Sequence, residues 1–227
     1  MIRCAMFDFG NVLGIFDTPR WYRFINKYRG NCLEPHEIFS GAIAHLVKDF
    51  DLGRINETEF YSQIRLAYRM SIPNQGDFFE EFGSNFVIDD EMFKIVKDLK
   101  QRGLATVLIS NLNPFHDKCV TERHPEVFES FNYLMISSRE GVAKPDSEAW
   151  IRPIEQLGLK PEECVFVDDS RKNIEVACGL GIKGWHYNVT DIIFCQNGRL
   201  EEERLKFKNF LTLLGNLSIF FDKNKSH

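Results

Sequence analysis

The sequence predicts an α/β fold with a parallel sheet, because short apolar runs recur along the chain and helical patterns separate them. The runs occupy residues 2–7, 105–110, 134–137, 164–167 and, more weakly, 182–187. Runs this short and this apolar are typical of central parallel strands that are buried on both faces. We therefore expect a sheet whose strands lie inside the molecule, covered by helices on both sides.

Helical periodicity fills three of the intervening segments, at residues 89–102, 146–157 and 171–180. The first has one apolar face, formed by Met92, Ile95, Val96 and Leu99. Gly103 follows it as a C-terminal stop. The second contains Pro153, which should kink or disturb the helix because proline lacks the backbone N–H. The third has a stripe formed by Ile174, Ala177 and Cys178.

The first two apolar runs are far apart, and the stretch between them looks helical without a buried-strand pattern. Within it, Asn56 and Glu59 have the spacing of a helix-start capping box. We interpret residues 17–86 as an inserted helical cap on a core formed by residues 1–16 and 87–190. Residues 191–227 are expected to form a C-terminal extension, with an amphipathic helix at 200–217 and a frayed tail at 222–227.

Composition restricts the function classes. The 227 residues carry a net charge of −5 with no long basic block, so partners such as nucleic acid and anionic membrane are not expected. No segment approaches the roughly 18 apolar residues of a membrane helix, and the strand-like start leaves no room for a signal peptide. The six cysteines lack CxxC or zinc-site spacing. They are interpreted as buried free thiols of a cytoplasmic protein.

Polar residues follow the predicted strands, at the edge of a parallel sheet where ligands bind. The first strand leads into Asp8, Gly10 and Asn11, and the second ends at Ser110 and Asn111. Lys144 follows the third strand, while Asp168 and Asp169 end the fourth, with Asn173 shortly after. Each group alone is typical of a turn or helix cap. Two adjacent carboxylates, however, repel each other unless a cation or a donor lies between them.

Taken together and in this order, these groups resemble the four motifs of the haloacid dehalogenase-like (HAD) hydrolase superfamily, over a core of about 150 residues. The resemblance is to the type with a small helical cap between the first two motifs. It is to the branch with an Asp-x-Gly-Asn-Val first motif, which includes sugar-phosphate phosphatases of the glucose 1-phosphate type. It implies a Rossmann-like core and Mg²⁺ as cofactor, with a small phosphorylated molecule as substrate.

The resemblance assigns roles that fit the residue types. Asp8 would be the nucleophile that forms an aspartyl-phosphate, which water then hydrolyses. Asp8, the carbonyl of Gly10 and Asp169 would bind Mg²⁺, which prefers oxygen ligands, and Asp168 would be a further ligand or an outer-shell partner. Ser110, Asn111 and Lys144 would bind the phosphoryl group, and Lys144 would also hold Asp8 in place. Asn173 is expected to brace the acidic loop. His116 and His124 are interpreted as structural.

One position departs from the motif: Gly10 stands where the superfamily has a second Asp that protonates the leaving group. Acid–base catalysis is typically worth about 10²–10⁴-fold, so the departure matters. The leaving group could need little protonation, as in a glycosyl or acyl phosphate. Asp17 could instead supply the proton, although Asp17 before Thr18 and Pro19 is also a typical helix start. The chain could also be a weak or silent relative.

Three functions are therefore open. The favoured one is a Mg²⁺-dependent phosphatase acting on a small phosphomonoester, with a sugar phosphate as the expected substrate. The first alternative is a metal-free 2-haloacid dehalogenase, in which halide leaves without a proton; paired acids such as Asp168 and Asp169 would be out of place there. The second is a catalytically silent protein that binds a phospho-ligand or a partner. The oligomeric state does not follow from the sequence.

Overall fold

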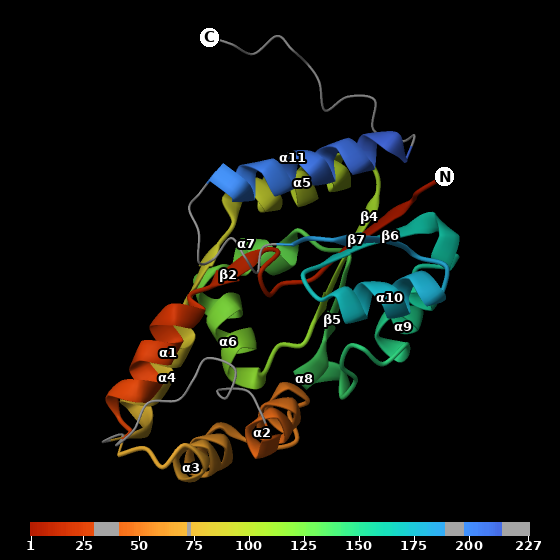
Figure 1. The fold of residues 1–227 in the computed structure, drawn as a ribbon. Coiled ribbons are helices and arrows are strands. Elements are labelled where there is room, and N and C mark those ends of the chain that lie inside the picture. The colour runs from red at the N-terminus through yellow and green to blue at the C-terminus, as the bar shows by residue number, and fades with distance from the viewer. Residues whose placement is uncertain (30–40, 72–73, 189–197, 215–227) are drawn as a thin grey trace.

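The computed structural model describes residues 1–29, 41–71, 74–188 and 198–214. Five parallel strands form its sheet, in the order β5-β4-β1-β6-β7 (Figure 1). They are β1 (Cys4–Phe7), β4 (Ala105–Ser110), β5 (Tyr133–Ile136), β6 (Cys164–Asp168) and β7 (Lys183–His186). β1 is the central strand, and its Cys4 pairs with Ala105 on one side and Cys164 on the other. The predicted α/β fold with a parallel sheet is confirmed.

Helices cover both faces of the sheet (Figure 1). One face packs against α5 (Asp90–Gln101) and α11 (Gly198–Leu213), and the other against α9 (Glu148–Gln156) and α10 (Arg171–Gly179). Side chains alternate along the central strand: Ala5 and Phe7 join the first apolar cluster, whereas Cys4 and Met6 join the second. Two buried faces explain why the strands have continuous apolar runs in place of an alternating pattern.

The predicted helices of the core are present. In α5 the apolar face is buried as expected, and Asp89 caps the first turn by accepting from the backbone N–H groups of Glu91 and Met92. The helix α9 contains Pro153 and continues beyond it to Gln156, so the proline removes one hydrogen bond without ending the helix. The apolar stripe predicted for α10 was wrong at one position. Cys178 is exposed, because α10 covers the edge strand β7 and buries only Ala177 fully.

Four helices form a separate unit with its own aromatic core; we call α1–α4 the helical unit. They are α1 (Thr18–Lys27), α2 (Gly41–Asp51), α3 (Glu57–Ala67) and α4 (Gln75–Gly83). Their shared core includes Trp21, Phe60 and Phe78, and the rings of Phe50 and Phe60 stack with centroids 4.1 Å apart. The predicted capping box of α3 is confirmed. In Figure 1 the helical unit lies at the lower left.

A short antiparallel pair joins the helical unit to the sheet: β2 (Gly14–Phe16) and β3 (Phe86–Ile88), with Phe16 opposite Phe86. The sequence did not predict these strands, because each has three residues and neither is fully buried. The two ends of the inserted segment therefore leave the core side by side.

The remaining helices are short connections or lie at the end of the described chain. They are α6 (Pro114–Arg123), α7 (Pro125–Glu129), α8 (Ser137–Glu140) and the 3-10 turn Pro161–Glu163.

The C-terminal helix α11 begins two residues before the predicted start. It buries Phe207 and Leu211 in the core, and its Arg204 bonds the buried Asp89 at 2.7 Å. Residues 215–217 and 222–227 of the predicted extension lie outside the described residues.

Two further expectations concern the described part of the chain. None of its helices is long and apolar enough to cross a membrane. Four of its cysteines, Cys4, Cys119, Cys164 and Cys178, are free thiols, and Cys178 is the exposed one. Cys32 and Cys195 lie outside the described residues.

Candidate active site

Three carboxylates converge at the carboxyl ends of neighbouring strands. Asp8 directly follows β1, Asp168 ends β6, and Asp169 comes next. Because β1 and β6 are paired in register, Phe7 lies opposite Val167, and the residues that follow come together. One carboxylate oxygen of each acid lies within 4.8 Å of the others. The convergence expected from the strand ends is therefore present.

Lys144 places a buried ammonium group against this cluster. Its Nζ lies 2.7 Å from Oδ1 of Asp8 and 2.6 Å from Oδ2 of Asp168, and its side chain is 2% exposed. Asn111 holds the backbone of Lys144 from two sides: its Oδ1 accepts from the Lys144 N–H, and its Nδ2 donates to the Lys144 carbonyl. The Asn111 side chain is therefore engaged with protein, which leaves its backbone as the candidate contact for a phosphoryl group.

Asp168 is fully buried and surrounded by donors. Its oxygens accept from the Ser170 N–H, from Nδ2 of Asn173 and from Lys144. These bonds occupy both oxygens. The geometry therefore favours a role for Asp168 in orienting Lys144, and disfavours direct binding of a ligand by Asp168. The expected bracing role of Asn173 is confirmed.

Asp169 is oriented by a turn that also carries Gly10. Its Oδ2 accepts from Nδ2 of Asn11 at 2.9 Å. Asn11 has a φ of 54°, a left-handed conformation that asparagine tolerates better than most residues. The turn is tight because the Phe9 carbonyl accepts from the Gly14 N–H, and a Cβ at Gly14 would lie 2.5 Å from the Phe9 ring. Asn11 was not predicted to have a role, although asparagine beside glycine is a typical signal for a turn.

The charges of the cluster do not balance. Three carboxylates face one ammonium group, which gives a formal charge of −3 + 1 = −2. Burial raises the pKa of Asp8 to about 8; the Lys144 charge opposes this rise, and the charges of Asp168 and Asp169 add to it. Burial also raises the pKa of Asp169. For Lys144, burial acts to lower the pKa, but the charges of Asp168 and Asp8 outweigh it and the pKa is raised.

A divalent cation fits this arrangement. A charge of +2 would neutralise the cluster and favour the ionised form of Asp8, and carboxylate oxygens are the ligands that Mg²⁺ prefers. Asp8 and Asp169 are placed to supply such oxygens, and Gly10 lies between Asp8 and Asn11 on the same turn. The donor set therefore agrees with the magnesium site expected from the sequence.

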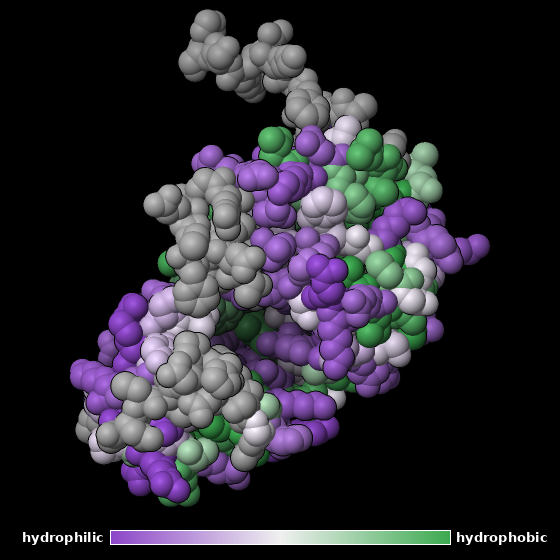
Figure 2. Space-filling view, viewed as in Figure 1, coloured by the Kyte–Doolittle hydropathy of each residue, from purple (hydrophilic) through white to green (hydrophobic). Residues whose placement is uncertain are grey.

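A cavity of about 130 Å³ lies against the cluster. It is lined by Asp8, Phe9, Gly10, Phe16, Ser110, Asn111, Leu112, His116, Lys144 and Asn173. The lining comes from the ends of β1, β2 and β4, from Lys144 between α8 and α9, and from the first turns of α6 and α10. Figure 2 shows a hollow in the molecular surface between the helical unit and the sheet part of the molecule.

Comparison with known proteins places the chain in a family. A family model for haloacid dehalogenase-like hydrolases matches residues 2–181. The chain belongs to this family. It is 27% identical over 143 residues to the sesquiterpene phosphatase astK of Aspergillus oryzae, covering 61% of this chain and 70% of that protein. It is 28% identical over 103 residues to the GMP/IMP nucleotidase YrfG of Escherichia coli, covering 45% of this chain and 46% of that one.

The fold of this HAD-like hydrolase also resembles that of the HAD family enzyme BT-2542 from Bacteroides thetaiotaomicron. The TM-score is 0.69 at 23% identity, over 84% of this chain and 96% of that one. That enzyme was crystallised in complex with magnesium and inorganic phosphate. At this identity the likeness shows a shared fold.

Asp17 does not line the cavity of the hydrolase. Its side chain is exposed and accepts from the Arg20 N–H at 2.8 Å, so it caps the start of α1. A Cβ at Gly10 would have one neighbour within 4 Å, Cε2 of Phe16 at 3.7 Å. The position of the missing second Asp therefore faces an aromatic ring, and the assignment of Asp17 as proton donor stays a prediction.

His116 belongs to a network that joins the helical unit to the core. Nδ2 of Asn113 lies 3.2 Å from Oδ1 of Asp51 and 3.1 Å from Nδ1 of His116, and Nε2 of His116 lies 2.8 Å from the Phe82 carbonyl. Since the Asn113 amide nitrogen is a donor, Nδ1 of His116 accepts and Nε2 carries the hydrogen. The Asp51 carbonyl also accepts from Oγ of Ser137, at 2.5 Å. The ends of α2 and α4 are thus tied to the core beside the cavity.

We expect His116 to make the folded state sensitive to acid. Burial lowers the pKa of His116 to about 4, which the hydrogen bond to the Phe82 carbonyl opposes. At this histidine the unfolded chain therefore binds a proton between about pH 6.5 and pH 4 that the folded chain does not, so the contribution of His116 to stability falls as pH falls through this window. Between about pH 7 and pH 5, the histidine term should remove about 2 kcal/mol of unfolding free energy.

Urea denaturation of wild type and His116→Gln at both pH values measures this effect, because glutamine cannot titrate. The exposed His45 supplies a matched control, and His45→Gln should leave the pH dependence of stability unchanged. An equal pH dependence in wild type and His116→Gln would show that the histidine does not contribute.

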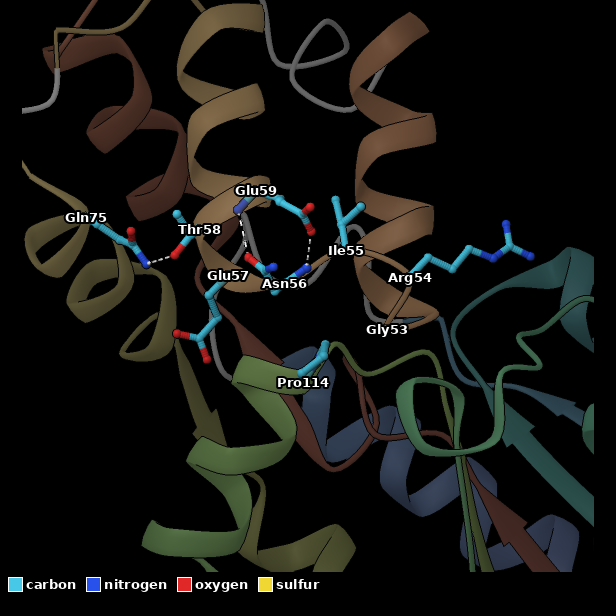
Figure 3. Close-up of a pocket in the computed structure, with 9 residues that line it drawn as sticks. All are labelled: Gly53, Arg54, Ile55, Asn56, Glu57, Thr58, Glu59, Gln75 and Pro114. Carbon is cyan, nitrogen blue, oxygen red and sulfur yellow. Dashed lines mark hydrogen bonds between the residues drawn. The ribbon is translucent and has the colours of Figure 1, made fainter.

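A larger cavity of about 640 Å³ lies elsewhere, where the N-terminal ends of α3, α4 and α6 meet (Figure 3). Its polar side chains are bonded within the protein: those of Asn56 and Glu59 each accept from the other residue's backbone N–H, and Nε2 of Gln75 donates to Oγ1 of Thr58 at 3.4 Å. Arg54 points away from the other labelled side chains. This cavity holds none of the predicted site residues, and the chemistry is expected at the smaller one.

Proposed function

We propose that this HAD-like hydrolase is a Mg²⁺-dependent phosphatase that hydrolyses a small phosphomonoester through an aspartyl-phosphate on Asp8. One observation carries the proposal: the buried carboxylate of Asp8 lies beside Lys144, in a cluster of three acids and this one lysine that has a formal charge of −2. Asp8, the Gly10 carbonyl and Asp169 would hold Mg²⁺, and Asp168 would orient Lys144 from behind. The cation would supply charge neutralisation for the phosphoryl oxygens.

In the first step, a carboxylate oxygen of Asp8 attacks phosphorus, and the bond from phosphorus to the ester oxygen breaks with its electron pair remaining on that oxygen. Lys144, Oγ of Ser110 and the backbone of Asn111 would stabilise the phosphoryl oxygens. The leaving oxygen takes a proton from water or from Asp17. In the second step, water attacks the aspartyl-phosphate, which releases phosphate and restores Asp8.

The relatives support phosphate chemistry without defining the carbon group. One is named as a phosphatase of a sesquiterpene and the other as a nucleotidase, and these substrates are chemically different. The sequence resemblance adds a small sugar phosphate as a third candidate. Dehalogenation is disfavoured, because a site that releases halide has no need of the excess negative charge around Asp8.

We also propose that residues 17–86 act as a cap on a core formed by residues 1–16 and 87–190, with residues 191–227 as an extension. Support comes from the separate aromatic core of the helical unit and from its attachment through the paired strands β2 and β3. Such a cap would limit the access of water and substrate to Asp8.

The proposal is tested with a panel of phosphomonoesters in Mg²⁺ and in EDTA. We expect removal of the metal to lower kcat/KM by at least about 100-fold, because the phosphoryl charge and the Asp8 carboxylate would lack their counter-ion. Asp169→Asn should abolish the response to Mg²⁺. The control Asp90→Asn replaces an exposed acid in the first turn of α5 and should behave as wild type.

Two outcomes would contradict the phosphatase. Halide release from 2-haloacids in EDTA, without hydrolysis of any phosphate, would identify a dehalogenase. No turnover of either substrate class, with a rise in Tm on adding Mg²⁺ and inorganic phosphate, would identify a silent binding protein.

A further inference from the structure

The residues that line the cavity at Asp8 fall into two chemical groups. Five are polar or charged, namely Asp8, Ser110, Asn111, Lys144 and Asn173, and the first four are those to which the proposed function assigns the phosphate chemistry. The others, apart from Gly10, are Phe9, Phe16, Leu112 and His116, which form an apolar and aromatic wall. Phe16 is central to this wall: its ring lies near the rings of Phe9, at 6.4 Å between centroids, and His116, at 5.5 Å.

The backbone of this wall offers no free donor at three of its positions. The Phe9 N–H donates to Oδ1 of Asp8, and the Phe16 N–H donates to Oδ1 of Asn11. The Leu112 N–H donates to Oγ of Ser137. A hydroxyl group placed here would therefore find these amides already bonded.

Several side chains that line the cavity also have their hydrogen-bonding groups occupied. Both ring nitrogens of His116 are engaged, Nδ1 by Asn113 and Nε2 by the Phe82 carbonyl, so the imidazole presents its ring to the cavity. Among the polar lining residues, the amides of Asn111 and Asn173 are also bonded within the protein, to Lys144 and Asp168. A polyhydroxylated group would lose its bonds to water on entering and would not regain them.

We propose that the cavity selects phosphomonoesters with an apolar, aryl-type group next to the ester oxygen over polyhydroxylated ones, with Phe16 as the residue that determines this specificity. The inference rests on the proposed phosphatase function. It gives a function to the absence of a second Asp at position 10. With glycine there, the space beside the turn is bordered by the ring of Phe16 and holds no carboxylate. An aromatic group would pack against Phe16 and the ring of His116.

Benzyl phosphate and glucose 6-phosphate provide a matched pair of substrates. Each carries its phosphate on a CH₂ group attached to a six-membered ring, so the esters are alike and the rings differ in polarity. With saturating Mg²⁺, we expect the full-length protein to show a kcat/KM at least about tenfold higher for benzyl phosphate. Equal values, or a preference for glucose 6-phosphate, would overturn the inference while leaving the phosphatase function intact.

Two variants test the assignment of Phe16. Phe16→Asn should lower kcat/KM for benzyl phosphate by at least about tenfold and change that for glucose 6-phosphate by less than about threefold. Phe16→Leu keeps an apolar side chain and should retain the preference. Parallel losses on both substrates would mean that Phe16 is only structural and would overturn its role. If Phe16→Asn does not fold, Phe16→Thr takes its place with the same expected result, and the wild-type ratio still tests the preference itself. Mg²⁺-dependent turnover of neither ester would remove the function on which the inference rests.

Discussion

Replacing Lys144 with methionine should lower the unfolding free energy by about 3–5 kcal/mol in metal-free buffer, because removing one partner of a buried ion pair leaves its charge uncompensated. The side chain of Lys144 is 2% exposed, and its Nζ lies within 2.7 Å of both Asp8 and Asp168. Methionine has a similar length and no charge, so the variant removes the ammonium group while largely retaining the packing. Hydrolysis should also fall by about 10²–10³-fold, since the phosphoryl group loses a cation.

The loss of stability should be smaller in saturating Mg²⁺, because the cation would offset part of the missing charge. Urea denaturation with and without Mg²⁺ measures both values. Lys94→Met is the matched control: Lys94 is 70% exposed and pairs with Glu91 on the surface of α5, so its loss should leave the unfolding free energy close to that of wild type. Equal losses for the two variants would show that the buried ion cluster does not contribute as described.

Asp8→Asn should lower kcat by at least about 10⁴-fold, because the amide cannot act as the nucleophile. Folding should survive the change. The ionised form of Asp8 is disfavoured by burial, which raises its pKa to about 8, and a neutral amide of the same shape removes that cost. We therefore expect a Tm no lower than that of wild type, measured beside the steady-state rate.

A loss of activity with an unchanged Tm separates the chemical role of Asp8 from a structural one. Asp90→Asn, which replaces an exposed acid, should retain both activity and Tm. Substantial residual turnover in Asp8→Asn would show that another group attacks phosphorus.

The sequence predicted the sheet and α5 because their signals depend on burial alone. The strands β1 and β6 are buried along their whole length, and the apolar stripe of α5 repeats with helical spacing. The convergence of Asp8 with Asp169 followed from a rule of topology, namely that parallel strands end at one edge. Lys144 was assigned through the family resemblance, supported by the proline that follows it and by its place before a predicted helix.

Other features depend on contacts between distant segments, which periodicity does not encode. The clamp of Asn111 on the Lys144 backbone joins residues 33 positions apart. The Asn113 amide contacts both Asp51 and His116. His116, which was interpreted as structural, is held by this network in the wall of the cavity. The strands β2 and β3 have too few residues to form a pattern, and the exposure of Cys178 follows from the place of β7 at the sheet edge.

The central claim is that Asp8 takes up the phosphoryl group, and trapping that intermediate tests it most directly. Wild-type protein is acid-quenched during turnover with Mg²⁺ and benzyl phosphate, digested, and analysed by mass spectrometry. We expect one phosphoryl group on the peptide that contains Asp8, removable by hydroxylamine and absent from Asp8→Asn. Steady turnover with the phosphoryl group on a different residue would contradict the account.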